Sequence, residues 1–185
     1  MDRKQFLRNA TILTGAAVVS PLLTKSLFGS PSHTSNKEGL IKMGKIVGAG
    51  EGRQLNVLGD KMTFKLTGED TGNQYTLIEQ NNEPGVGIPT HVHTGEDEVF
   101  KVIEGRLELS VGGETTILNP GDIGFCPRNV PHSWRVVGNS NAKVDLSFFP
   151  SGLERMFEEL AQLPPGRPDM KVVGEICGRY GLRFV

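Results

Sequence analysis

The sequence predicts an all-β fold, a barrel or sandwich of short strands, followed by C-terminal helices. Runs that alternate apolar and polar residues recur between residues 54 and 149, at a spacing that gives about ten strands. Turn-forming residues separate these runs, and the 185-residue chain contains 24 glycines and 11 prolines. After Pro150 the apolar period changes to that of a helix.

Composition narrows the class of protein. A chain of 185 residues can bury a core of its own without staples. The net charge is -1 and the pI is about 6.4, so we expect no nucleic-acid partner and no attraction to an acidic membrane surface. Cys126 and Cys177 lie in no C-x-x-C pattern, which excludes a zinc finger and a thioredoxin-like redox site. In an exported protein they could pair, and otherwise they are buried thiols.

Residues 1–30 are predicted to be an export signal. Basic residues precede an apolar run over residues 10–19 that is too short to span a bilayer comfortably. The segment resembles a twin-arginine signal with Lys4 in place of the second arginine. We therefore expect a periplasmic protein without stable membrane insertion; an uncleaved anchor, or a cytoplasmic protein whose segment is no signal, are the alternatives. Residues 31–43 are polar and are predicted to be a linker.

Residues 44–150 are predicted to form the barrel. Apolar and polar residues alternate in each run, and Gly, Asn or Asp bound most of the runs. Gly112 and Gly113 predict a tight hairpin. The strands are expected at residues 54–58, 61–66, 74–79, around His91, and at 99–103, 107–111, 114–118, 122–126, 132–137 and 143–149.

Residues 151–185 are predicted to be a helical extension. Ser151 and Glu154 match an S-x-x-E capping box ahead of an apolar stripe at helical spacing. A second helix is expected over residues 168–179, with Gly181 as its C-cap. The stripes would dock against the barrel, cover its open end or seat a second subunit, and we expect a homodimer.

Residues 85–105 carry the strongest functional signal. His91 and His93 stand two apart, so on a strand their side chains leave the same face about 6–7 Å apart and can reach one ion. Glu98 follows a short loop that can return its carboxylate to that ion, and His132 offers a third imidazole. Three nitrogens and one oxygen suit a divalent first-row transition metal and leave positions open for a ligand.

This spacing resembles the two motifs of the cupin family. The first motif, G-x5-H-x-H-x3-4-E-x6-G, is filled by Gly85, His91, His93, Glu98 and Gly105. The second, G-x5-P-x-G-x2-H-x3-N, is matched at Gly121, Pro127 and His132, whereas Asn129 and Val136 replace the family's glycine and asparagine. Asn129 suits the turn because asparagine tolerates positive φ.

The resemblance implies a double-stranded β-helix, the cupin jelly roll, that binds one divalent metal ion: Fe, Mn, Ni, Co, Cu or Zn. The alternative is a barrel that keeps these residues and binds no metal. Residues 120–122, Pro-Gly-Asp, extend the likeness to quercetin dioxygenase-type cupins. That likeness implies a metal-dependent dioxygenase-like oxidoreductase for a small flavonol- or diketone-like substrate, with Glu98 doubling as the catalytic base. A non-oxidative isomerase or lyase, and a binding barrel without turnover, stay open because the fold hosts unrelated activities.

Period two along the strands sorts the residues that would line the pocket. If Glu98 and His132 point inward, residues two and four positions further on do so too. The predicted lining is Phe100, Val102, Phe125, Trp134 and Val136. At the end of the strand at 122–126, either Phe125 or Cys126 reaches the interior, depending on any bulge near Pro127. An apolar, aromatic cavity around a metal suits a flat ligand that offers one or two oxygens to the ion; alternatively, the aromatic side chains simply fill the barrel.

Overall fold

The computed structural model describes residues 44–185 of the chain. The predicted export signal and polar linker, residues 1–43, lie outside the described residues, so the predictions of export and localisation stay predictions. Among residues 44–185, no helix has both the length and the apolar character that crossing a membrane would require.

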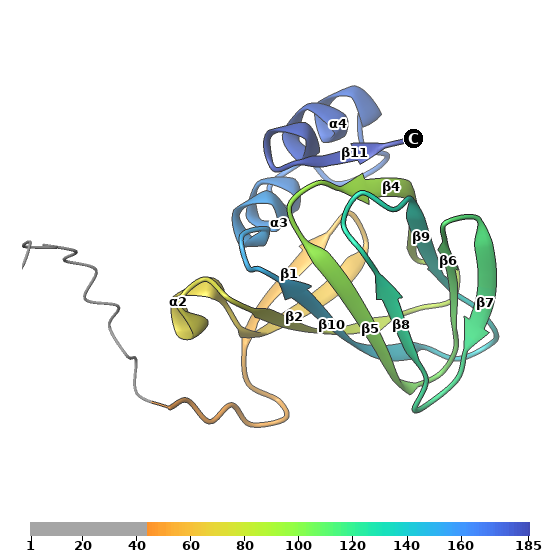
Figure 1. Cartoon of the computed structure of the whole chain (residues 1–185), viewed down its shortest axis with the longest axis horizontal. Coiled ribbons are helices and arrows are strands. Elements are labelled where there is room, and N and C mark those ends of the chain that lie inside the picture. The colour runs from red at the N-terminus through yellow and green to blue at the C-terminus, as the bar shows by residue number, and fades with distance from the viewer. Residues whose placement is uncertain (1–43) are drawn as a thin grey trace, which may run out of the picture. The chain divides into compact units, whose positions relative to one another are not determined.

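Two antiparallel sheets form the body of this part of the chain (Figure 1). The six-stranded sheet has the order β1-β2-β3-β10-β5-β8, and the five-stranded sheet has the order β11-β4-β9-β6-β7. The strands are β1 (Arg53–Val57), β2 (Asp60–Leu66), β3 (Thr76–Asn82), β4 (Gly87–His93), β5 (Asp97–Glu104), β6 (Leu107–Val111), β7 (Glu114–Leu118), β8 (Ile123–Cys126), β9 (His132–Val136), β10 (Ala142–Phe149) and β11 (Leu182–Phe184). The helices are α2 (Gly68–Thr71), α3 (Glu154–Ala161) and α4 (Met170–Arg179). The all-β prediction with C-terminal helices is confirmed.

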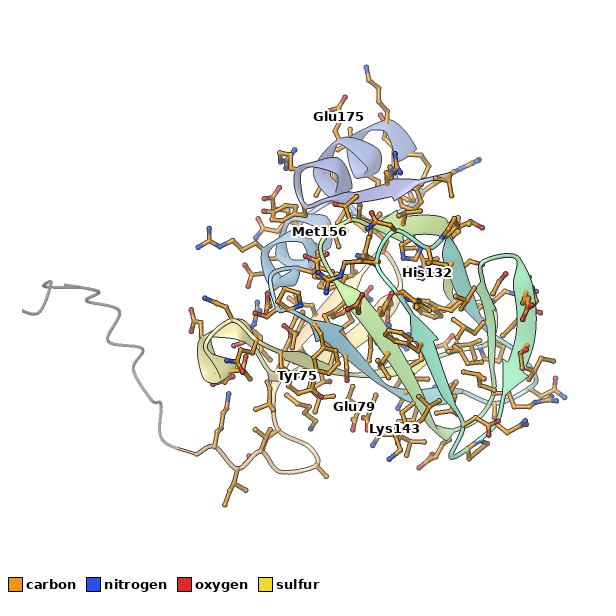
Figure 2. All side chains as sticks on the ribbon, viewed as in Figure 1. Tyr75, Glu79, His132, Lys143, Met156 and Glu175 are labelled. Carbon is orange, nitrogen blue, oxygen red and sulfur yellow. The ribbon has the colours of Figure 1, made fainter. Side chains whose placement is uncertain are left out.

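The core lies between the two sheets, because every second residue of each inner strand faces inward. On β10, Val144, Leu146 and Phe148 are buried while the residues between them are only partly covered. Each such side chain contributes on the order of 1.5–3 kcal/mol by leaving water. On the outer face of the same sheet Lys143 and Glu79 form an ion pair with Nζ and Oε2 3.0 Å apart (Figure 2).

The turn between β5 and β6 depends on Gly105. Its φ is 74°, in the left-handed region, and a Cβ at this position would lie 2.3 Å from the carbonyl oxygen of Asn141. The second glycine of the predicted histidine motif is therefore needed for chain packing rather than for binding.

The predicted capping box at the start of α3 is wrong. The N-cap is Leu153 and no side chain caps the helix, while Ser151 Oγ is buried without a partner among the described residues. The Glu154 carboxylate instead accepts hydrogen bonds from the Gly68 amide (2.8 Å) and the Thr76 hydroxyl (2.6 Å). Tertiary partners thus replace the local cap and tie α3 to the six-stranded sheet.

Strand β11 was not expected from the sequence. It pairs with β4, placing Leu182 opposite His93 and Phe184 opposite His91. Gly181, predicted to be a C-cap, follows the C-cap Tyr180 of α4 with a φ of 77° and starts the return to the sheet. Figure 1 shows α3, α4 and β11 gathered at the end of the two sheets where β4 lies. The predicted homodimer stays a prediction.

Replacing Leu182 by Ala tests the contribution of β11. Leu182 is 2% exposed, so we expect the free energy of unfolding to fall by about 2–4 kcal/mol. Replacing its neighbour Arg183, which is exposed, by Ala should change stability by less than about 0.5 kcal/mol. Urea denaturation of the two variants measures both values, and equal small effects would show that β11 adds little to the fold.

Candidate metal centre

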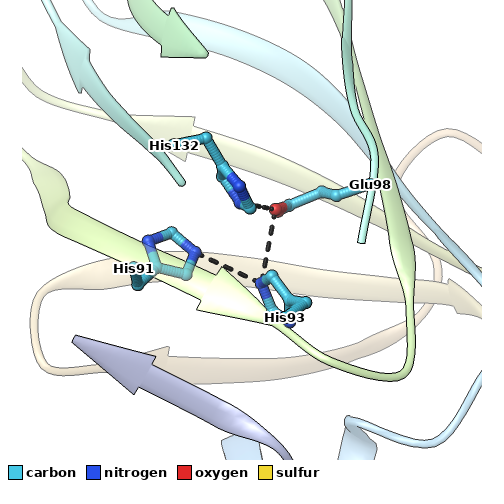
Figure 3. Close-up of side chains that lie close together, drawn as sticks. All are labelled: His91, His93, Glu98 and His132. Atoms are coloured by element: carbon cyan, nitrogen blue, oxygen red, sulfur yellow. Dashed lines mark hydrogen bonds and ion pairs between the residues drawn. The ribbon is translucent and has the colours of Figure 1, made fainter. Parts of the chain in front are cut away.

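Four buried side chains bring one potential metal-ligand atom each to within 4.8 Å of one another: His91, His93, Glu98 and His132. Figure 3 shows them converging from strands of both sheets. His91 Nε2 lies 3.2 Å from His93 Nε2, and Glu98 Oε2 lies 2.8 Å from His132 Nε2 and 3.4 Å from His93 Nε2. Ligand atoms about 2.0–2.2 Å from one ion stand about 3 Å apart, so these separations fit a single metal.

A β-bulge on β4 aims two of these histidines inward. The register against β9 shifts between Ile88 and His91, where β4 has one residue more than its partner. Without that residue, strict alternation from the inward-facing Ile88 would place Thr90 and Val92 in the cavity. The bulge changes the phase, and His91 and His93 face inward instead. Pro89, which has no amide to lose from the ladder, lies within it.

Backbone carbonyls fix the rings of two of the histidines. His91 Nδ1 donates to the carbonyl oxygen of Pro89, and His132 Nδ1 donates to that of Val130, each at 2.9 Å. A carbonyl oxygen can only accept, so Nδ1 carries the proton in both rings. In the neutral ring Nε2 then presents a lone pair to the centre, which is how metal-binding histidines are usually oriented.

The chemistry of this group fits a cation. The Nε2 atom of a neutral imidazole and the carboxylate of Glu98 offer only lone pairs to the centre, and such atoms at 2.8–3.4 Å repel unless a proton or a metal ion lies between them. Burying a carboxylate that is 3% exposed is also costly without a compensating charge. A proton on His93 can relieve part of this repulsion, and one metal ion would satisfy all four ligand atoms together.

Glu96 lies on the opposite side of the His93 ring from the other ligands. Its Oε2 is 3.8 Å from His93 Nδ1, and neither atom has a hydrogen-bond partner among the described residues. Glu96 therefore does not join the ligand atoms. At this distance the Glu96 carboxylate acts on the His93 ring through its charge rather than through a hydrogen bond.

Burial and the nearby carboxylates set the protonation of His91 and His93 in the metal-free protein. Burial lowers the pKa of His91 to about 4, so this ring is neutral at pH 7. Burial also acts to lower the pKa of His93, but the nearby carboxylates of Glu96 and Glu98 outweigh it and raise that pKa to about 9. Burial acts to raise the pKa of Glu98, and its hydrogen bonds with His132 and His93 outweigh this and lower it.

The turn before β9 holds the third histidine against the first pair. Asn129 has a φ of 64°, as expected for a residue that replaces glycine. Its amide donates to the carbonyl oxygen of His93 at 2.7 Å. Beside it, Arg128 Nη2 pairs with Asp97 Oδ2 at 2.8 Å. This turn therefore links the β4 end that carries His93 to the start of β9.

The ligand group opens onto a cavity of about 670 Å³. Its walls come from both sheets, and α3, α4 and β11 cover one end. Of the three placements expected for the helices, covering the open end of the barrel agrees with this arrangement. Apart from His91, His93 and Glu98, the lining is Val57, Leu58, Asp60, Met62, Gln80, Glu83, Pro84, Gly85, Val86, Gly87, Ile88, Pro89, Trp134, Leu146, Phe148, Met156, Phe157, Leu160, Pro168, Met170, Val173, Cys177, Leu182 and Phe184.

The predicted pocket lining is correct only in part. Trp134 lines the cavity, whereas the side chains of Phe100, Val102 and Val136 are buried in the core between the sheets. The prediction for Phe125 is wrong: this side chain is 56% exposed. No bulge changes the phase of β8, which pairs Cys126 with the inward-facing Glu98, so Cys126 takes the inner position. Like Cys177, it is a free, buried thiol.

Two polar residues of the cavity escaped the sequence analysis. Asp60 and Gln80 lie on β2 and β3, away from both motifs. Gln80 falls at an inward position of β3, between Ile78 and Asn82, which are also buried. In the sequence, the signal for Gln80 is a polar residue at an inward position of an alternating strand. That signal can be used only once it is known which face of β3 is buried.

Comparison with known proteins agrees with the motif spacing. Residues 79–149 match the family described as Cupin domain. A quercetin 2,3-dioxygenase from Bacillus subtilis is 31% identical over 105 residues, covering 57% of this chain and 30% of that protein. One from Aspergillus japonicus is 30% identical over 101 residues, covering 51% and 29%. The chain thus spans about a third of the length of these curated relatives. The structure of KdgF from Halomonas sp. superposes with a TM-score of 0.53 at 21% identity, covering 62% of this chain and 99% of that one.

These findings define the class of protein. The two sheets form a cupin jelly roll, residues 79–149 match the cupin-domain family, and the chain resembles quercetin dioxygenase-type proteins. The buried group of three histidines and one glutamate lies within the matched domain and fits a single metal ion, as in metal-binding cupins.

Replacing His93 by Ala tests the assignment of the ligands. We expect metal content to fall from about one ion per chain to a small fraction of that, because one of the four ligands is lost. The lost ring is also the one whose Nε2 lies near both His91 Nε2 and Glu98 Oε2. Elemental analysis of protein purified without an affinity tag gives the measurement. The matched control is His33→Ala, which removes the one histidine outside the group. A full metal complement in the His93 variant would show that the ligands are assigned wrongly.

Metal affinity should depend on pH through His93. Its pKa of about 9 means that the ring is protonated at pH 7 in the metal-free protein, and a protonated imidazole cannot bind metal. The apparent affinity should therefore rise about tenfold per pH unit between pH 6 and 8 and level off near pH 9. Competition with a chelator of known affinity measures this slope, and an affinity that is constant over the range would contradict the protonated state of His93.

Proposed function

We propose that the protein is a metal-dependent dioxygenase that acts on a small, apolar, oxygenated substrate such as a flavonol or a 1,3-diketone. The observation that carries the proposal is the opening of the three-histidine, one-glutamate group onto a largely apolar cavity. The similarity to two quercetin 2,3-dioxygenases supports the reaction type.

The residues of the centre would divide the work. His91, His93 and His132 would hold the ion, and backbone carbonyls fix the ring orientations of His91 and His132. A bound divalent transition metal supplies Lewis acidity and redox chemistry at positions that the four ligands leave open. Glu98 would accept the proton of a substrate hydroxyl, because it is the carboxylate of the group and faces the cavity.

The low pKa of Glu98 belongs to the metal-free protein. Burial acts to raise it, but hydrogen bonds with His132 and His93 lower it more strongly, and a carboxylate held so firmly ionised is a weak base. In the metal-loaded protein the Nε2 atoms of His93 and His132 would hold the ion, and Glu98 would no longer accept a hydrogen bond from them. Its capacity to accept a proton is thus tied to an occupied centre.

The cavity walls favour an apolar substrate. Among the described residues that line it, none is a lysine or an arginine. A sugar phosphate or a small polyanion would find no cation there apart from the metal, whereas aromatic rings can pack against Trp134, Phe148 and Phe157. This lining supports a flavonol- or diketone-like substrate over the sugars and small acids of a non-oxidative isomerase or lyase.

Oxygen uptake by the metal-loaded protein tests the proposal. We expect dioxygen consumption in the presence of a flavonol or a 1,3-diketone, and a fall in its rate by about 10²–10⁴ in Glu98→Gln, because the amide cannot accept the proton. An oxygen electrode gives the rates, and elemental analysis shows whether the variant keeps its metal. Asp97→Asn is the matched control, since Asp97 pairs with Arg128 outside the ligand group.

The alternatives predict other results. A metal-loaded protein that consumes no dioxygen with either substrate class would contradict the dioxygenase and favour an isomerase or lyase, or a barrel that binds without turnover. Full activity in Glu98→Gln would leave the dioxygenase standing and remove the proton-accepting role of Glu98.

A further inference from the structure

A second polar group lines the cavity, on strands that carry no metal ligand. Asp60 is the first residue of β2, and Gln80 is an inward-facing residue of the neighbouring strand β3. Both line the same cavity as His91, His93 and Glu98. Gln80 is 1% exposed, a degree of burial that is unusual for a glutamine.

Hydrogen bonds hold this group in one arrangement. Gln80 Nε2 donates to Asp60 Oδ2 and Asn82 Nδ2 donates to Asp60 Oδ1, each at 2.6 Å. Asn82 Oδ1 in turn accepts from the amide of Lys61 at 2.8 Å. Because an ionised carboxylate only accepts, the nitrogen of each amide must face Asp60. The orientation of Gln80 is thereby fixed.

This arrangement leaves one acceptor without a donor. Gln80 Oε1 is buried and has no hydrogen-bond partner among the described residues. Leaving a buried polar oxygen unpaired is costly, and a methionine or leucine would fill the same inward position without that cost. Each Asp60 oxygen also keeps lone pairs beyond the single amide bond it accepts. Asp60 and Gln80 both line the cavity, and the complement of their unpaired acceptors is a hydrogen-bond donor.

We propose that Asp60 and Gln80 form a subsite that accepts a hydrogen bond from a hydroxyl group of the substrate, remote from the oxygens that bind the metal. This inference rests on the proposed function and narrows its substrate class: the preferred molecule carries a chelating pair of oxygens, an apolar ring system, and a further hydroxyl. A flavonol with additional ring hydroxyls has this pattern, whereas a flavonol that carries only its chelating hydroxyl lacks the last part.

The charge of the subsite agrees with a neutral donor. Burial is the largest influence on Asp60 and raises its pKa to about 6, so the carboxylate gains from any donor that replaces lost water. Glu83 is the acidic lining residue besides Asp60 and the metal ligand Glu98. Its Oε1 lies 2.9 Å from Lys61 Nζ, so its charge is already paired. Asp60 and Gln80 are thus the part of the cavity wall, away from the centre, that is free to bind a hydroxyl.

Anaerobic binding of two flavonols tests the subsite without turnover. The probes are quercetin and 3-hydroxyflavone, which share the chelating group and differ in their additional ring hydroxyls. With the metal-loaded protein we expect quercetin to bind about tenfold more tightly. In Gln80→Met that ratio should fall toward one through weaker quercetin binding, with 3-hydroxyflavone affinity and metal content unchanged. Spectrophotometric titration measures the affinities, and elemental analysis measures the metal.

Controls separate the subsite from general effects. Asn81→Leu changes an exposed amide on the other face of β3 and should leave the ratio as it is. Gln80→Leu, a second variant of the same position, should repeat the loss if Gln80→Met folds poorly. Equal affinities of the two flavonols for the wild-type protein, or an unchanged ratio in both Gln80 variants, would overturn the subsite and leave the dioxygenase proposal intact. Failure of the metal-loaded protein to bind either flavonol would overturn the proposal that the substrate is a flavonol, and the subsite with it.

Discussion

The structure depends on one electrostatic constraint: lone pairs from both sheets meet at a buried point that positive charge must fill. His91, His93 and His132 come from the five-stranded sheet and Glu98 from the six-stranded sheet. A buried carboxylate with no compensating charge would cost several kcal/mol. In the metal-free protein a proton on His93 supplies that charge, and a metal ion is the cation that would satisfy all four residues at once.

Local backbone features deliver the ligands to this point. The bulge on β4 changes which face His91 and His93 occupy, and the carbonyl of Pro89 within it fixes the first of these rings. The Asn129 turn holds the start of β9, which carries His132, beside this pair, because the Asn129 amide donates to the backbone carbonyl oxygen of His93. The helices and β11 then close the end of the cavity. The centre is therefore set by strand irregularities as much as by regular sheet.

The sequence predicted the features that depend on residues close together in the chain. The H-x-H pair, Glu98 and His132 stand at spacings that a strand and short turns translate directly into proximity, and alternation predicted ten strands near their observed places. Features decided by distant partners were missed. The phase of β8 decides between Phe125 and Cys126, and only pairing with β5 shows it.

The remaining misses have the same origin. Glu154 matches a capping box in sequence, yet its carboxylate finds better partners in Gly68 and Thr76. Strand β11 has three residues, too few for a periodic signal, and it forms only because β4 offers an edge. Asp60 and Gln80 lie on different strands and meet only in the folded sheet. Their spacing in the sequence therefore matches no motif that would predict the contact.

X-ray absorption spectroscopy at the edge of the bound metal tests the central claim most directly. We expect the metal to be surrounded by nitrogen and oxygen atoms at about 2.0–2.2 Å, with the multiple-scattering pattern of about three imidazoles. A shell that contains sulfur, or one without imidazole scattering, would contradict a centre built from His91, His93, Glu98 and His132.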